Sequence, residues 1–302
     1  MDRRAFLKRM AGVGLGLAAT SVALPTSAKC KVISPVSDLI ANNYLDQRIK
    51  IEIEKIKSNN PKLRLGETHC HSTFSDGNFP IQQIMERSAS LGLDFLVVTE
   101  HIIPRYYSLE NSLQSFKERL RVFENWKLKN TPRINIYPAF EISTLQGHLI
   151  LVFPPHFLKE KYHREFRSQF SKYNHKMDNM DTIAQLAQPF GGASIIAHPE
   201  IERSYPFGAP MDFIKQNLVG LVDGIEDVSS GHGYDKDYSK ELNLSSVGSS
   251  DDHFNFTIGT TATAYDGARY TNLITALKAK ATKAIKVEDS LRDVITAARM
   301  II

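Results

Sequence analysis

The sequence predicts a parallel α/β fold. Short apolar runs alternate with amphipathic helical patterns roughly six or seven times along the 302 residues, which is the order expected of strands joined by crossover helices. The chain is 42% hydrophobic and 23% charged, so it has enough apolar residues for one large domain or two small ones. Histidines and carboxylates follow several of the apolar runs, and function is therefore expected at strand ends.

The strands are predicted from continuous apolar runs or from apolar/polar alternation. They cover residues 63–65, 94–99, 133–137, 148–153, 193–197, 221–225, 244–247 and 260–264. The apolar run within 94–99 indicates a strand that is buried on both faces.

Helices are predicted where apolar residues recur at steps of three and four. They cover residues 37–56, 80–90, 109–129, 181–188, 270–281 and a last segment after Asp289. Within the first helix Ile49, Ile51 and Ile53 also alternate, so a late switch to a strand remains open.

Some residues that can bear chemistry are predicted to have structural or surface roles. With only Cys30 and Cys70 in the chain, a disulfide framework is not expected, and Cys70 is predicted to be a buried packing residue. Residues 159–176 are charged and aromatic and predict a surface helix or lid, with His163 and His175 exposed to solvent.

The first 28 residues resemble an export signal. Arg3 and Arg4 precede Phe-Leu-Lys, and a short apolar run leads to small residues that end at Ala28. The paired arginines resemble a twin-arginine signal, which the Tat export machinery reads, and cleavage is expected after Ala28. An uncleaved anchor helix is the alternative. The predicted organisation is a signal peptide at 1–28, a helical extension at 29–63 and a catalytic domain at 64–302.

Most of the net charge of +4 lies in this first segment. Arg3, Arg4, Lys8 and Arg9 stand there against Asp2, so the segment carries +3 and the remainder of the chain +1. A domain with so little excess positive charge is not expected to bind a nucleic-acid duplex.

A candidate metal site follows the first predicted strand. Side chains alternate faces along a strand, so His69 and His71 point the same way and Cys70 points the other way. Asp76 follows in the next loop. Imidazoles together with a carboxylate suit a divalent cation. Two surface histidines on a loop would be the simpler interpretation if this pair stood alone.

Further candidate ligands lie at or just beyond the ends of other predicted strands. They are His101, Glu141, His198, Asp251 and His253. Six of the ten histidines, including His148, fall at strand junctions. The carboxyl ends of the strands of a closed parallel barrel meet on one face, where such barrels hold their active sites. The sequence therefore predicts a metal cluster on that face.

Five blocks in this order resemble the PHP (polymerase and histidinol phosphatase) domain metallohydrolases over about residues 64–285. The blocks are His69-Cys70-His71-Ser72 with Ser75-Asp76-Gly77, Thr99-Glu100-His101, Glu141 with Gly147-His148, Ala197-His198-Pro199, and Ser250-Asp251-Asp252-His253. The chain departs from the family at Glu100, where the family has aspartate. Some subgroups also place the histidine of the third block later, where this chain has Leu151.

The resemblance implies a distorted (β/α)7 barrel that holds two or three divalent transition-metal ions, either Zn, Mn or Fe. One ion would lie among His69, His71, Glu141 and Asp251. Glu141 would bridge to a second ion held by His148 and His198. A third ion would be held by Asp76, His101 and His253.

Residues outside this ligand set are also candidates for the reaction. Asp251 and His253 are predicted to act at the reaction centre, and Asp252 beside them either moves protons or accepts supporting hydrogen bonds. Candidates for contacting a substrate phosphate are Arg203, Arg105, His232 and Arg269.

The function predicted from these features is an exported metal-dependent phosphoesterase, periplasmic or secreted from a bacterial cell, that acts on a small phosphorylated substrate or nucleotide. The same metal centre cleaving a non-phosphate bond, and a non-catalytic metal-binding barrel, are the alternatives. The export machinery is an expected partner, whereas no membrane partner is expected once the signal is cleaved.

Overall fold

The computed structural model describes residues 44–103, 106–127, 134–171, 179–201 and 207–288. The predictions that lie outside the described residues concern the export signal, Cys30, Arg105, His175, Arg203 and the helix after Asp289.

A mixed ten-stranded sheet forms the centre of the described structure. Its strands are β1 (Leu63–Glu67), β2 (Phe95–Ile102), β3 (Asn135–Ser143), β4 (His148–Val152), β5 (Ala193–Ile196), β6 (Gly224–Ser229), β7 (Tyr234–Asp235), β8 (Ser245–Ser249), β9 (Thr261–Asp266) and β10 (Lys283–Lys286). They are hydrogen-bonded in the order β10-β9-β1-β2-β3-β4-β5-β6-β7, and β8 pairs with β6.

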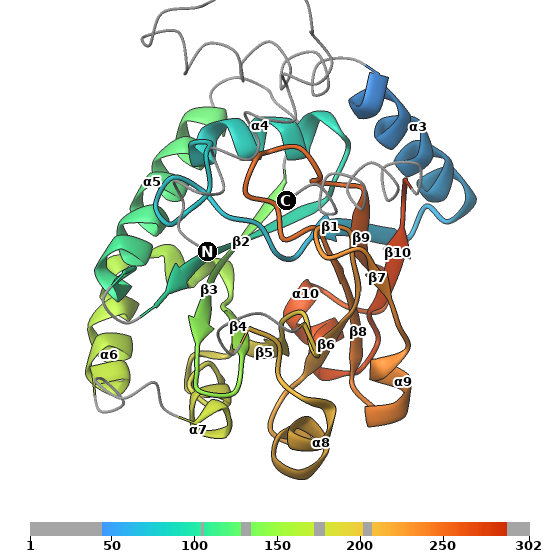
Figure 1. Cartoon of the computed structure of the whole chain (residues 1–302). Coiled ribbons are helices and arrows are strands. Elements are labelled where there is room, and N and C mark those ends of the chain that lie inside the picture. Colours follow the sequence, from blue (N-terminus) through green and yellow to red (C-terminus); the bar gives the residue numbers. More distant parts are fainter. Residues whose placement is uncertain (1–43, 104–105, 128–133, 172–178, 202–206, 289–302) are drawn as a thin grey trace, which may run out of the picture.

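Most of the helices pack along the outer side of this sheet, whereas Leu273 and Leu277 of the last one pack on its inner side with Phe95 and Val97. The helices are α3 (Tyr44–Asn59), α4 (Ile81–Ser90), α5 (Leu109–Lys127), α6 (Glu160–Phe170), α7 (Met180–Ala184), α8 (Met211–Phe213), α9 (Tyr238–Leu242) and α10 (Leu273–Lys278), with short 3-10 or π turns η2 (Pro155–Leu158), η4 (Gln188–Phe190) and η5 (Ile214–Leu218). Figure 1 shows α5 and α6 outside β2 and β3, whereas α3 lies on the side of β9 and β10. Among the described helices none has both the length and the apolar character needed to cross a bilayer.

The sheet closes between β1 and the segment that follows β8. Cys70 and Asp252 form a parallel bridge there, and the amide of His71 donates to the carbonyl of Asp252 at 2.8 Å. Strands β1 to β6 and β8 thus form a ring, which confirms the predicted α/β barrel. Cys70 is fully buried, as predicted.

The sheet is mixed, whereas the sequence predicted parallel strands. Strand β4 runs antiparallel to both neighbours, and β9 runs antiparallel to β1. Only residues 144–147 connect β3 to β4, and so short a connection cannot carry the chain back for a parallel pairing. Strand β10, which was not predicted, pairs with β9, and β6 starts later than expected, so that Glu226 lies within the strand.

Helix α3 packs on the barrel as part of its core. It remains helical to Asn59, so the switch to a strand does not occur. Ile49 and Ile53, one turn apart, are fully buried in the same apolar cluster as Leu65, while Ile51 is 58% exposed. The helical spacing, not the alternation, therefore decides which of the three isoleucines face the barrel.

The prediction of a solvent-exposed His163 was wrong. Its ring is buried between Phe116 and Phe157, and Nε2 lies 2.8 Å from the carbonyl oxygen of Phe157. Helix α6 buries Phe166 on the same face, one turn from His163, because the phenylalanines of β3 and of η2 and the one directly after β4 form an apolar cluster beneath it. The charged residues of the segment lie on its outer face, and because they dominate its composition the buried face with His163 and Phe166 was not recognised in the sequence.

We predict that Ile49→Ala lowers the free energy of unfolding by about 2–5 kcal/mol, because it leaves a cavity between α3 and the barrel. Ile51→Ala on the same helix is the matched control and should change it by less than about 0.5 kcal/mol. Denaturant unfolding of both variants checks this. Equal effects would mean that α3 does not pack on the barrel.

Candidate metal centre

The candidate ligands converge at one end of the barrel. His69 and His71 follow β1, His101 lies near the end of β2, and Glu141 lies near the end of β3. The others are His148 at the start of antiparallel β4, His198 after β5, and Asp251 and His253 after β8. Because β4 runs in the opposite direction, its first residue lies at the same end of the barrel as the last residues of its neighbours.

Four side chains form the innermost cluster. Nε2 of His69 lies 3.1 Å from Nε2 of His71, and both nitrogens lie 3.1–3.3 Å from Oδ1 of Asp251 and Oε2 of Glu141. Two ring nitrogens and two carboxylate oxygens that approach one another this closely suit a shared divalent cation, and these are the residues expected around the first ion.

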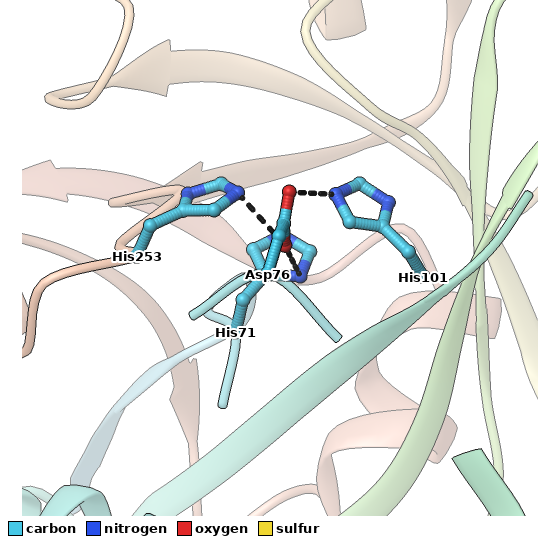
Figure 2. Close-up of side chains that lie close together, drawn as sticks. All are labelled: His71, Asp76, His101 and His253. Atoms are coloured by element: carbon cyan, nitrogen blue, oxygen red, sulfur yellow. Dashed lines mark ion pairs between the residues drawn. The ribbon is translucent and has the colours of Figure 1, made fainter. Parts of the chain in front are cut away.

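A second cluster centres on Asp76 (Figure 2). Its Oδ2 lies 3.4 Å from Nε2 of His101, and its Oδ1 lies 3.3 Å from Nε2 of His253. Oδ1 is also 3.9 Å from Nδ1 of His71, whose Nε2 faces the first cluster. His71 therefore lies between the two clusters, which was not expected of it.

The other carboxylate oxygen of Glu141, Oε1, contacts His148 and His198. Oε1 lies 2.7 Å from Nδ1 of His148 and 2.9 Å from Nε2 of His198. His198 can also share a cation with His69 and Asp251, whereas His148 groups with Glu141 and His101. Nε2 of His148 lies 3.0 Å from the hydroxyl of Ser143. The structure thus brings all nine predicted ligands together, in overlapping groups.

The electrostatics of the cluster favour charged carboxylates. Burial raises the pKa of Glu141 and Asp251, but the neighbouring histidines, chiefly His101 and His69 for Glu141 and His69 and His253 for Asp251, outweigh burial and hold both pKa values well below their ordinary range. Burial and the charges of His253 and His101 lower the pKa of His71 to about 3. Ionised carboxylates and neutral imidazoles are the forms that ligate metals, so His69, His101 and His253, whose pKa values the neighbouring carboxylates raise against the effect of burial, would each lose a proton on binding one.

Several ligand atoms are buried and lack hydrogen bonds. Within the described residues, Nδ1 of His71, Oδ1 of Asp76 and Oε2 of Glu141 are buried and have no hydrogen-bond partner. Burying polar atoms in this way is costly unless something compensates. Bound divalent cations would compensate all three, so the residues present fit the metal ions that the resemblance implies.

Two buried glutamates that were not predicted as site residues support this cluster. Oε1 of Glu226 lies 2.8 Å from Nδ1 of His69, and its Oε2 accepts from the amide of His198 at 2.7 Å. Glu67 accepts from the amides of His69 and Ser250, and burial raises its pKa to about 7. Glu67 ends β1, and Glu226 directly follows the predicted run 221–225 although it lies within β6, so their position at the end of an apolar run was the signal that could have found them.

Asp252 turns away from the cluster. Its carboxylate accepts from the amides of Phe254, Phe256, Thr257 and Ile258. This role matches the supporting hydrogen bonds that were considered for it, and it fixes the loop that carries His253. A carboxylate engaged by so many donors is not placed to move protons.

The residues predicted to bind phosphate are distributed differently. Nε2 of His232 lies 2.6 Å from Oδ2 of Asp251, so His232 orients a ligand. Arg269 is exposed and follows β9, whose last residues pair with the start of β1, which places it at the opposite end of the barrel. Arg105 and Arg203 lie outside the described residues.

His198 and Asp251 adopt backbone conformations that are unusual for residues with side chains. Their φ angles are +28° and +47°. Such strain persists only where the surrounding structure enforces it, and it clusters at functional sites. Here the amide of His198 is held by Glu226 and the side chain of Asp251 by His232.

The comparisons with known proteins identify the fold. No protein-family model and no curated protein matches the chain. A two-domain protein from Bacteroides vulgatus ATCC 8482, which contains a predicted PHP-like metal-dependent phosphoesterase, is 22% identical with a TM-score of 0.53 over 74% of this chain. This chain spans 65% of that structure's length. PsfC from Pseudomonas syringae PB-5123 is 14% identical with a TM-score of 0.50, covering 80% of this chain and 97% of PsfC. At these identities the likeness shows a shared fold.

One similar structure corrects the expectation that a nucleic-acid duplex is excluded. Endonuclease Q, solved with a 27-mer duplex that carries an abasic lesion at the active site, is 16% identical with a TM-score of 0.44 and covers 67% of this chain and 52% of its own. A structure in the same set of matches holds a duplex, so the low net charge of this chain was not a sufficient reason for the exclusion, and the exclusion was wrong.

We predict that the protein binds at least two Zn or Mn ions per chain, because two clusters with separate carboxylates are present. Elemental analysis after loading and desalting checks this. His71→Ala should lower the content because His71 borders both clusters. His156→Ala, which removes an exposed histidine, is the control and should leave it unchanged. Less than one ion per parent chain would contradict the assignment.

Proposed function

We propose that the protein is a metal-dependent hydrolase of phosphoester bonds and a member of the PHP superfamily. The observation that carries this proposal is the pair of adjoining clusters at the carboxyl end of the barrel, in which three carboxylates and six histidines converge. The five sequence blocks and the fold shared with a predicted PHP-like phosphoesterase support the same conclusion.

The residues that would hold the ions are those of the two clusters: His69, His71, Asp76, His101, Glu141, His148, His198, Asp251 and His253. When bound there, two divalent ions supply a water that is nucleophilic near neutral pH and stabilise charge on the phosphoryl oxygens. The choice among Zn, Mn and Fe, and between two and three ions, belongs to this proposal and follows from mixed imidazole and carboxylate ligands.

The protein's own contribution is to orient the ligand side chains before substrate binds. Glu226 fixes the ring of His69 through Nδ1, which leaves Nε2 directed at the cluster. His232 fixes Oδ2 of Asp251 and leaves Oδ1 facing His69 and His71. Outer partners of this kind set the orientation of the ligands and raise their basicity.

The substrate proposed is a small phosphorylated molecule or a nucleotide. Arg105 follows His101 and Arg203 follows His198 within a few residues along the chain. A guanidinium at either place could pair with a phosphate in bidentate fashion.

We predict that Asp251→Asn lowers kcat for an aryl phosphate ester more than about 100-fold, since even outer partners of metal ligands are worth about 10–100-fold. Hydrolysis of a generic aryl phosphate monoester and diester by metal-loaded protein measures it. Asp212→Asn, an exposed substitution on α8, is the control and should keep the parent rate. A variant that retained most of the parent kcat with full metal content would refute the role of Asp251.

Export is also proposed, on the basis of Arg3 and Arg4 and the apolar run that follows them. Ligands drawn from residues 69–253 assemble only after most of the barrel has folded, so export of a folded protein would let the cytoplasm supply the metal. We predict that Arg3→Lys combined with Arg4→Lys leaves a folded, metal-loaded precursor in the cytoplasm. Fractionation with metal analysis tests this, and efficient export of the double variant or a metal-free precursor would contradict it.

A further inference from the structure

The residue at which the chain departs from the PHP pattern, Glu100, lies next to His101 on β2. Neighbours on a strand point to opposite faces, so the carboxylate of Glu100 projects away from the side occupied by His101. It is fully buried. Its partners are two serine hydroxyls and one arginine, and none of these belongs to the metal clusters described above.

Both oxygens of Glu100 hold the loop that carries Asp76. The hydroxyl of Ser72 donates to Oε1 at 2.5 Å, and the hydroxyl of Ser75 donates to Oε2 at 2.7 Å. One carboxylate therefore spans the turn that immediately precedes Asp76. A side chain shorter by one methylene, such as aspartate, would withdraw both acceptors from the loop by about one bond length.

The loop is also folded tightly upon itself. The carbonyl of Ser72 accepts from the amides of Ser75 and Gly77 at 3.0 Å each, and the hydroxyl of Ser72 accepts from the amide of Phe74 at 3.3 Å. A Cβ at Gly77 would lie 2.3 Å from the carbonyl oxygen of His71, so only glycine fits there. The position of Ser72 thus fixes the path of residues 72–77.

Arg119 of α5 contacts the carboxylate from the outer side of the sheet. Its Nη2 lies 3.6 Å from Oε1 of Glu100 and donates to the hydroxyl of Ser115 at 3.0 Å, while Nη1 donates to the carbonyl of Tyr137 at 3.5 Å. Glu100 and Arg119 are both fully buried. A buried ion pair contributes little net stability compared with well-packed apolar residues, so its presence here points to a role in specifying geometry.

We propose that Glu100 is a positioning residue: held by Arg119, it clamps Ser72 and Ser75 so that Asp76 faces His101 and His253. This inference rests on the metal-dependent function proposed above. Two neighbouring residues of β2 then act on one cluster, His101 directly and Glu100 through the loop.

The test is the double variant Ser72→Ala with Ser75→Ala in the full chain, which removes both hydroxyls and leaves the Glu100–Arg119 pair in place. We expect amide hydrogen exchange at residues 73–77 of the metal-free protein to accelerate, and the affinity for Zn, measured by chelator competition, to fall about 10–100-fold. The single variant Ser75→Thr retains both hydroxyls, so its hydrogen exchange and its Zn affinity should stay close to those of the parent protein. Ser88→Ala is the control, because it removes a fully buried hydroxyl that donates to the carbonyl of Ile84 within α4 and not to Glu100.

A double-mutant cycle separates positioning from a general loss of stability. In an Asp76→Ala background the cluster has lost its carboxylate, so the serine substitutions should cause little further loss of Zn affinity. Additive losses, parent-like Zn binding by the double serine variant, or unchanged exchange at residues 73–77 would each overturn the proposal. A parent protein that binds no Zn would refute the metal-dependent function instead, and the exchange measurement on metal-free protein would still decide whether the clamp exists.

Discussion

The carboxylate of Glu141 contacts imidazoles supplied by four separate parts of the barrel, and the arrangement of the whole site depends on this set of contacts. Oε1 meets the rings of β4 and of the segment after β5, and Oε2 meets those of β2 and of the segment after β1. A lone carboxylate at this depth would be strongly disfavoured. The surrounding imidazoles and bound cations remove that penalty, so burial of Glu141 is tolerated only when the strands are correctly assembled around it.

Much of the site could be predicted because its residues fall where apolar runs end. His101 and Glu141 follow such runs directly, and a barrel brings run ends together without any knowledge of distances. Glu226 was missed although it directly follows the predicted run 221–225; it lies within β6 and reaches the cluster only through His69 and His198. The arrangement of the ligands into overlapping groups, with His71 between two clusters, depends on ring orientation, which spacing along the chain does not specify.

The errors in the fold have similarly local causes. The antiparallel direction of β4 follows from a four-residue connection that contains Gly147 at φ +150°, so the length of the gap was a better guide than the strand–helix rhythm. His163 was placed in solvent because charged residues dominate its segment, although Phe166 one turn later belongs to the core. The length of the connection before β4 indicated its direction, and the apolar residues on one face of 159–176 indicated the burial of His163, although the overall composition of these segments did not.

The ring of strands closes at a seam, the bridge between Cys70 and Asp252, and this closure gives an ion at the first cluster a second effect, on the entropy of the unfolded chain. His71 and Asp251 lie 180 positions apart, on the two sides of that seam. An ion bound to both would be a crosslink that closes a loop of most of the folded domain. By the loop-entropy argument used for disulfides, a permanent link over such a span disfavours the unfolded chain by about 5 kcal/mol. The cation would thus act on the unfolded ensemble as a reversible staple, and its release would loosen the barrel at the position where the two ends of the ring meet.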